Sequence, residues 1–157
     1  MRKSVLVPAS PVSEPRPALD SWLDLEHLAS LEISSEDPAH PFEHALAGTE
    51  SEGWKSCDPG PQTIRFKFDE PRSIRRVRVE FREPHAERSQ EFTLSAVSNG
   101  EKREIVRQQF SFSPSGATAE IEDYTVNLAN VSSLELVIDP GRHDRQAHAS
   151  LQSIAIA

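Results

Sequence analysis

Histidine and cysteine side chains are the first candidates for metal or nucleophilic chemistry in this sequence. His40 and His44 are four residues apart, a spacing that can place two metal ligands on one face of a helix. Pro41 lies between them and no third ligand follows at a suitable spacing, so we interpret both as surface or capping histidines. Cys57 is the only cysteine, which excludes an internal disulfide and a cysteine-based zinc cluster. The sequence therefore predicts neither a bound metal nor another cofactor.

The motifs of common hydrolases and nucleotide-binding enzymes are also missing. Catalysis of those kinds needs a nucleophile beside a base, or paired acids in a cleft. The chain has no G-x-S-x-G, no phosphate-binding glycine loop and no H-E-x-x-H, and the acidic residues fall in turns or on solvated faces. Asp58 follows Cys57 directly and would disfavour a reactive thiolate there. We therefore predict no catalytic residues and a protein that is not an enzyme.

Charge is distributed unevenly along the chain. The net charge is −8, which argues against general binding of nucleic acids or polyanionic membranes. Between Arg65 and Arg88, however, eight Lys/Arg stand against five Asp/Glu. Within this segment Arg76, Arg78 and Arg82 share one side of an expected strand. A solvated strand face is the favoured interpretation, and an anion- or partner-binding face is the alternative.

From about residue 62 onwards, apolar and polar side chains alternate with a period of two, which predicts β-strands. One face is shared by each of the following sets: Ile64, Phe66 and Phe68; Val77, Val79 and Phe81; Phe92 and Leu94; Val106, Gln108, Phe110 and Phe112; and Leu134, Leu136 and Ile138. Ile121, Tyr124, Val126 and Leu128 are assigned to further strands, Leu151, Ile154 and Ile156 to a closing strand, and Leu28, Leu31 and Ile33 are the expected apolar contacts of an earlier strand. Turns are expected at "CDPGPQ", "DEPRS", "EPHAERS", "SNGEK" and "SPSG", and a long polar loop at "DPGRHDRQAHAS". The pattern predicts an all-β protein, an antiparallel jelly-roll β-sandwich of about eight strands.

Two further features complete the expected organisation. Residues 1–18 carry four of the twelve prolines and predict a disordered leader, so the domain would comprise residues 19–157. Pro41 and Gly48 bracket Phe42 to Ala47, which predicts a short helical turn with Phe42, Ala45 and Leu46 on one side.

Targeting signals are weak. No apolar run approaches the roughly 20 residues of a membrane span. The start offers only Val5 to Val7, shorter than the apolar core of a secretory signal. We therefore expect a cytoplasmic protein without a membrane segment.

The segments "LEISSEDPAHPFEHALAGTESEGWKS" and "QTIRFKFDEPRSIRRVRVEF" resemble the discoidin, or coagulation-factor C-type, galactose-binding-like superfamily. The resemblance covers roughly residues 26–157. The same segment resembles the amino-terminal domain of a eukaryotic single-strand-break-repair scaffold, and "RQQFSFSPSG" with "EDY" is similar to a bacterial group described as carbohydrate-binding. The superfamily includes sugar-binding, lipid-binding and scaffold domains, so the resemblance implies a fold more than a ligand.

The resemblance also implies where particular residues would act. Trp54 would plug the interior of the sandwich beneath the loops. Many relatives hold calcium just before this tryptophan, but Ala45 to Glu52 lacks the acidic residues in register, so no calcium is expected. A sugar would bind the loops at one end, where donors come from His85, Arg88, Arg142, His143 and Arg145. Phe42 and Phe112 could stack on a sugar but fit the core better.

Two functions from different classes remain open at this point. The first is a non-catalytic carbohydrate-binding module that uses those loops. The second is a protein-interaction or scaffold domain that uses the face of Arg76, Arg78 and Arg82 and binds no sugar. Direct nucleic-acid binding is disfavoured by the net charge, and we expect a monomer with a carbohydrate or protein partner.

Overall fold

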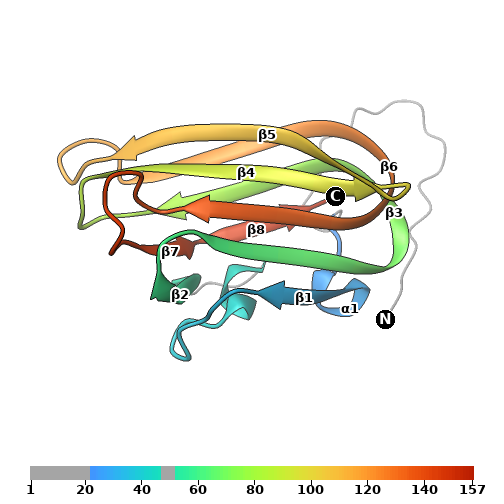
Figure 1. Ribbon diagram of the computed structural model, residues 1–157, viewed down its shortest axis with the longest axis horizontal. Coiled ribbons are helices and arrows are strands. Elements are labelled where there is room, and N and C mark those ends of the chain that lie inside the picture. Colours follow the sequence, from blue (N-terminus) through green and yellow to red (C-terminus); the bar gives the residue numbers. More distant parts are fainter. Residues whose placement is uncertain (1–21, 47–51) are drawn as a thin grey trace.

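Strands make up most of the chain in the computed structural model, which describes residues 22–46 and 52–157 (Figure 1). The elements are α1 (Leu25–Leu28), β1 (Ala29–Ile33), the 3-10 turn η2 (Phe42–Ala45), β2 (Trp54–Pro59), β3 (Gln62–Arg82), β4 (Arg88–Ser98), β5 (Glu101–Phe112), β6 (Ala119–Asp139), β7 (His148–Leu151) and β8 (Ser153–Ile156). Every pairing between these strands is antiparallel. The predicted all-β antiparallel class is confirmed, whereas the expected leader lies outside the described residues.

Two long strands, β3 and β6, build both layers of the sandwich. They pair with each other over most of their length, and their register shifts between Lys67 and Arg76. The first half of β3 pairs with β1 and its second half with β8, while the second half of β6 pairs with β4, and β4 with β5. The bends in β3 and β6 therefore carry the chain from one layer to the other (Figure 1).

This arrangement corrects two expectations from the sequence. "DEPRS" does not end a strand, because Arg72 still pairs with Val131 across the bend and β3 continues through it. "CDPGPQ" is not purely a turn, because β2 occupies Trp54–Pro59 and pairs with β7. The described residues do contain eight strands, but they are divided differently from those predicted.

The core lies between the two layers and consists mainly of the predicted alternating side chains. Trp54 is 0% exposed, and its indole Nε1 donates a hydrogen bond to the Ser35 carbonyl oxygen at 3.2 Å. Its ring centroid lies 6.2 Å from that of Phe42, which is buried as well. The prediction of an interior tryptophan is confirmed, and so is the helical turn that brings Phe42 and Ala45 inside.

Two large apolar side chains of the predicted strands are exposed. Leu31 is 38% exposed because β1 is the end strand of its sheet, and Ile121 is 50% exposed. Even-numbered positions of β6, such as Tyr124, face inward over this part of the strand, so the odd-numbered Ile121 faces outward. Glu122 consequently lies on the inner side, where burial and a hydrogen bond that its protonated carboxyl donates to Glu120 raise its pKa. Burial, Glu122 and Glu120 together raise the pKa of Tyr124 to about 12.

The connections follow ordinary turn chemistry. Asn99 and Gly100 have φ angles of 53° and 83° and form the predicted two-residue hairpin between β4 and β5. Helices are limited to single turns, and none within residues 22–46 and 52–157 is long and apolar enough to cross a membrane.

Candidate functional site

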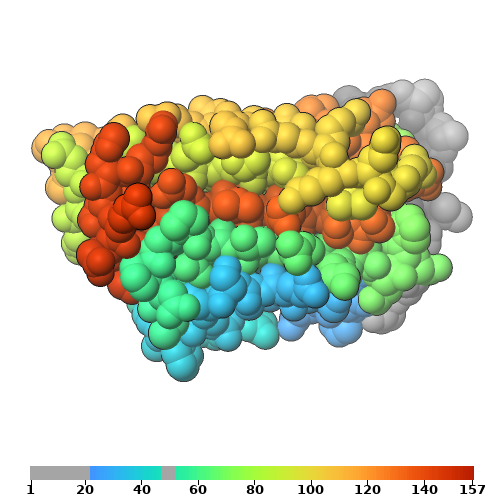
Figure 2. All heavy atoms as spheres, in the orientation of Figure 1, coloured from blue at the N-terminus to red at the C-terminus, as the bar shows by residue number. Residues whose placement is uncertain are grey.

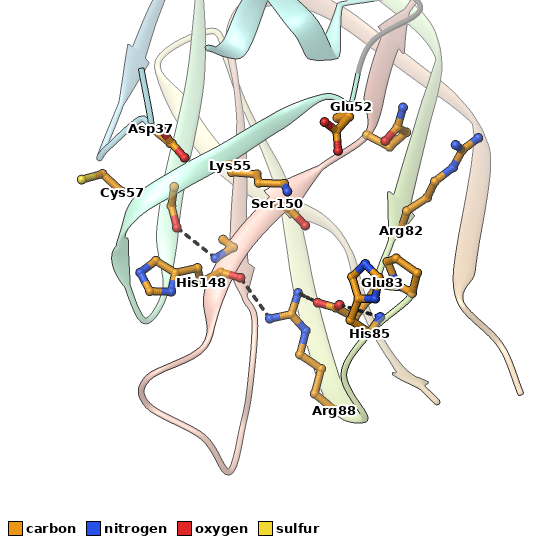
Figure 3. Close-up of a pocket in the computed structure, with 14 residues that line it drawn as sticks. Asp37, Glu52, Lys55, Cys57, Arg82, Glu83, His85, Arg88, His148 and Ser150 are labelled. Atoms are coloured by element: carbon orange, nitrogen blue, oxygen red, sulfur yellow. Dashed lines mark hydrogen bonds and ion pairs between the residues drawn. The ribbon is translucent and has the colours of Figure 1, made fainter. Parts of the chain in front are cut away.

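A polar pocket of about 800 Å³ lies at one end of the sandwich, between the β2–β7 pair and the loop that joins β3 to β4 (Figure 3). In Figure 2 the green surface of β2 and the red surface of the residues around β7 adjoin at this end. The residues that line the pocket are Asp37, Glu52, Lys55, Ser56, Cys57, Arg82, Glu83, Pro84, His85, Arg88, His148, Ala149, Ser150 and Gln152.

The β2–β7 pair forms one wall because its side chains alternate between core and surface. Lys55 pairs with Ser150, and Trp54, one position earlier, points into the core opposite Leu151. The same alternation places Ser56 inside, where its hydroxyl donates to the Asp58 carbonyl oxygen at 2.8 Å and accepts from the Ala149 N–H at 3.0 Å. Lys55 therefore stands on the pocket side of a wall that is held together beneath it.

Gly53 permits this wall to form. Its φ of +80° is a conformation that side chains disfavour. A Cβ atom at this position would lie 2.3 Å from the carbonyl oxygen of Leu151. The close approach of the two backbones thus requires glycine immediately before Trp54.

Arg88 joins the loop to the opposite wall. Its side chain is only 10% exposed; Nη1 donates to the His148 carbonyl oxygen at 3.0 Å and Nη2 lies 2.7 Å from Oε1 of Glu83. The second carboxylate oxygen of Glu83 accepts from the backbone N–H of His85 at 3.3 Å. Burial lowers the pKa of Arg88, while Glu83 and Asp144 raise it. The guanidinium therefore fixes the position of both walls of the pocket.

Charges in the pocket are balanced. Lys55, Arg82 and Arg88 face three carboxylates, those of Asp37, Glu52 and Glu83. The Ala39 N–H, His40 and Lys55 lower the pKa of Asp37 against an opposing effect of burial. Because cations and anions are present in equal number, the pocket offers both hydrogen-bond donors and acceptors without a strong net charge.

The structure brings together two of the five residues predicted to bind a sugar. His85 and Arg88 line the pocket, whereas Arg142, His143 and Arg145 are exposed on the loop before β7 and do not line it. Arg142 turns toward β5, and its Nη1 donates to Oε1 of Gln109 at 2.6 Å.

The three arginines of the predicted interaction face have different surroundings. Nε of Arg76 donates a hydrogen bond to Asp123 at 2.8 Å, and this contact lowers the pKa of Asp123. The guanidinium carbon of Arg76 lies 4.7 Å from the centroid of the Trp22 ring. Arg82 pairs with Glu80 at 2.9 Å and also lines the pocket. Arg78 makes no ion pair with any described residue within the usual distance.

Sequence reasoning missed several residues of the pocket, among them Lys55, Ser150 and His148. Lys55 follows an inward tryptophan, so alternation could have placed it on the surface once β2 was recognised. His148 ends the polar loop 141–148, which was a candidate for sugar binding, but it was not singled out. Ser150 carried no signal, because only the pairing of β7 with β2 brings it to this wall.

Metal-binding chemistry finds no support in the described part of the chain. Within residues 22–46 and 52–157, no three His, Cys, Asp or Glu side chains gather as metal ligands. His40 instead lies 3.3 Å from Asp37 through Nδ1 and 3.8 Å from Glu52 through Nε2. Most of the segment Ala45 to Glu52, considered above for calcium, falls outside the described residues.

Comparison with known proteins identifies the fold. No family model and no curated protein matches the sequence. The family 32 carbohydrate-binding module of Clostridium perfringens NanJ, in complex with galactose, is similar at a TM-score of 0.63 and 12% identity, covering 86% of this chain and 96% of that one. A family 32 module of a C. perfringens family 89 glycoside hydrolase, in complex with GalNAc-β-1,3-galactose, is similar at a TM-score of 0.63 and 16% identity. The match covers 87% of this chain and 99% of that one.

A third similar structure is a complex with a protein partner. Reduced XRCC1, bound to the catalytic domain of DNA polymerase β, matches at a TM-score of 0.56 and 13% identity, covering 80% of this chain and 92% of that one. At such identities the comparisons show the fold, which is galactose-binding-like, or discoidin-like, as the sequence predicted.

Proposed function

We propose that the chain is a non-catalytic binding module and that its pocket beside Arg88 binds a neutral, hydroxyl-rich carbohydrate. The observation that carries this proposal is the balanced set of donors and acceptors on two walls held by Arg88. A sugar hydroxyl both donates and accepts hydrogen bonds, so it is served by adjacent cations and carboxylates.

The ligands of similar structures support the same class. Two of them are sugar complexes, with galactose and with GalNAc-β-1,3-galactose, and both share the fold of this chain. Identities of 12% and 16% transfer no individual residue, so the assignment to this pocket rests on its own geometry.

The apolar face of the sugar would need a flat partner. No Trp, Tyr or Phe lines the pocket among the described residues, and the candidate platforms Phe42 and Phe112 are each 1% exposed, so they belong to the core. The rings of Pro84, His85 and His148 are the flat groups that remain. This favours weak binding through hydrogen bonds over strong stacking.

A glycan array followed by calorimetry tests the proposal. We expect binding at up to about millimolar concentration. Lys55→Ala and His85→Ala should each weaken it by about two- to tenfold, the loss of one hydrogen bond. His143→Ala is the matched control because His143 is exposed and lies outside the pocket. No bound glycan, or weakening by the control variant alone, would refute the assignment.

The scaffold alternative is favoured by one observation. Arg78 is a strand-face cation without an ion-pair partner among the described residues, and XRCC1 is bound to a protein partner in its complex. If this alternative is correct, a pull-down should return a partner that Arg78→Glu abolishes, while no glycan binds.

A further inference from the structure

An apolar pocket opens at the edge of the sandwich, away from the polar pocket. It has a volume of about 210 Å³ and lies between α1, β1 and η2, with Phe66 of β3 in its wall. Its apolar lining comes from Leu25, Ala29, Leu31, Phe42, Leu46 and Phe66. The volume suits one aliphatic side chain.

The strand beside this pocket is an open edge. β1 pairs with β3 on one side and is the last strand of its sheet, and Figure 1 shows no strand beyond it among the described residues. Leu31 lies on this strand and is 38% exposed, although its side chain lines the pocket. Exposed edges of this kind accept an added strand from another chain.

The backbone register shows which groups are available. The N–H of Ser34 donates to the Thr63 carbonyl oxygen at 3.0 Å, so alternate residues of β1 bond to β3. Ala29, Leu31 and Ile33 are the residues between, and their backbone groups point away from β3. The N–H of Ala29 is already bonded to the Leu25 carbonyl oxygen. The N–H and C=O groups of Leu31 and Ile33 therefore face an incoming strand beside the pocket.

The rim of the pocket carries negative charge. Glu26 and Glu43 line it, both are exposed, and neither forms an ion pair with a described residue. Glu32, on the same strand as Leu31, is already paired with Arg65 at 2.6 Å and lies 3.6 Å from Lys67. Two carboxylates without such a pair beside an apolar pocket favour a basic partner and disfavour a second copy of this acidic edge.

We propose that β1 binds an extended peptide segment of a partner protein by strand addition. An apolar side chain of that segment enters the pocket beside Leu31 and Phe42, and Lys or Arg side chains two residues away contact Glu26 and Glu43. The alternation of a strand places these three side chains on one face of the segment. This surface is separate from the polar pocket beside Arg88, so the peptide-binding and sugar-binding proposals can each fail without the other.

A designed peptide tests this directly. The probe is fluorescein-labelled Thr-Lys-Thr-Leu-Thr-Lys-Thr, titrated against the whole chain by fluorescence anisotropy. We expect binding that weakens about tenfold when the peptide leucine becomes alanine. Binding should be lost when the amides facing β1 are N-methylated, because strand addition needs those donors.

Charge exchange supplies the decisive control. The double variant Glu26→Lys with Glu43→Lys should bind the lysine peptide about tenfold more weakly. It should bind more tightly a peptide that has glutamate at both lysine positions. Glu87→Lys, an exposed glutamate in the loop between β3 and β4, should change neither affinity.

Other results would overturn the proposal. These are no binding at about millimolar peptide, equal binding of both peptides by the double variant, or binding that survives N-methylation. Dimerisation of the chain that Leu31→Lys abolishes would show that a second copy occupies the edge instead.

Discussion

Loss of the Arg88 guanidinium should destabilise the protein through a measurable coupling with Glu83. Their side chains are only 10% and 16% exposed, and Arg88 also donates to the His148 carbonyl oxygen at 3.0 Å. Breaking a fully buried ion pair costs about 3–5 kcal/mol. The cost here should be smaller, because part of each side chain reaches water and Nε of Arg88 makes no hydrogen bond that the substitution would remove. We therefore expect Arg88→Met to lower the free energy of unfolding by about 2–3 kcal/mol.

A double-mutant cycle with Glu83→Gln measures the interaction itself. Once Glu83 is uncharged, Arg88→Met should cost about 1–2 kcal/mol less than in the original chain. Urea unfolding followed by tryptophan fluorescence gives each free energy, with an unchanged m-value as the check on two-state behaviour. The pair Arg82–Glu80 is the control: Glu80 is 14% exposed, much like Glu83, but the Arg82 side chain is 58% exposed, so its coupling should stay below about 1 kcal/mol.

Additivity would refute this reasoning. If the cycle through Arg88 and Glu83 closes within about 0.5 kcal/mol, the pair does not hold the two walls together. The rigid pocket on which the proposed sugar binding relies would then lack its physical basis.

Three further results are expected. Trp54→Ala should lower the free energy of unfolding by about 3–5 kcal/mol, because a fully buried indole is lost from the core, and a cost near zero in urea unfolding would contradict its place there. Gly100 has a φ of +83° and no atom within 4 Å of the position of an added Cβ, so Gly100→Ala should cost only the roughly 1–2 kcal/mol of left-handed backbone strain. Gly53→Ala should lower the free energy of unfolding by well over that amount, because its added Cβ also meets the Leu151 carbonyl oxygen. Equal melting temperatures for these two variants would be inconsistent with a clash at Leu151. Glu122→Gln should stabilise the protein at pH 7: burial and Glu120 raise the folded-state pKa of Glu122, so its ionisation costs stability as pH rises above the unfolded value. The gain should vanish near pH 4, and a gain of the same size at both pH values would argue against a titration of Glu122.

The sequence alone determined the class of fold and most of the core. A period of two places alternate side chains on opposite faces whatever the topology, so the pattern by itself assigns Ile64, Phe66, Val77 and Val79 to the inward face, where all four are buried. The Asn99-Gly100 hairpin was equally local, because its φ angles depend on those two residues.

Strand boundaries depended on partners distant in the chain. β2 exists because β7 pairs with it, and β3 continues through "DEPRS" because Arg72 finds Val131 opposite. Neither partner can be inferred from the local sequence. Cytoplasmic location, a monomeric state and the division of the chain into a leader and one domain stay predictions.

Both proposed binding surfaces were decided by the tertiary structure. His85 and Arg88 were predicted from their loop, but Lys55 and Ser150 join them only because the backbones of β2 and β7 meet beneath the pocket. The open edge at Leu31 likewise follows from the position of β1 at the end of its sheet. Alternation specifies the face on which a side chain lies, whereas the order of strands specifies its neighbours, and binding depends on the neighbours.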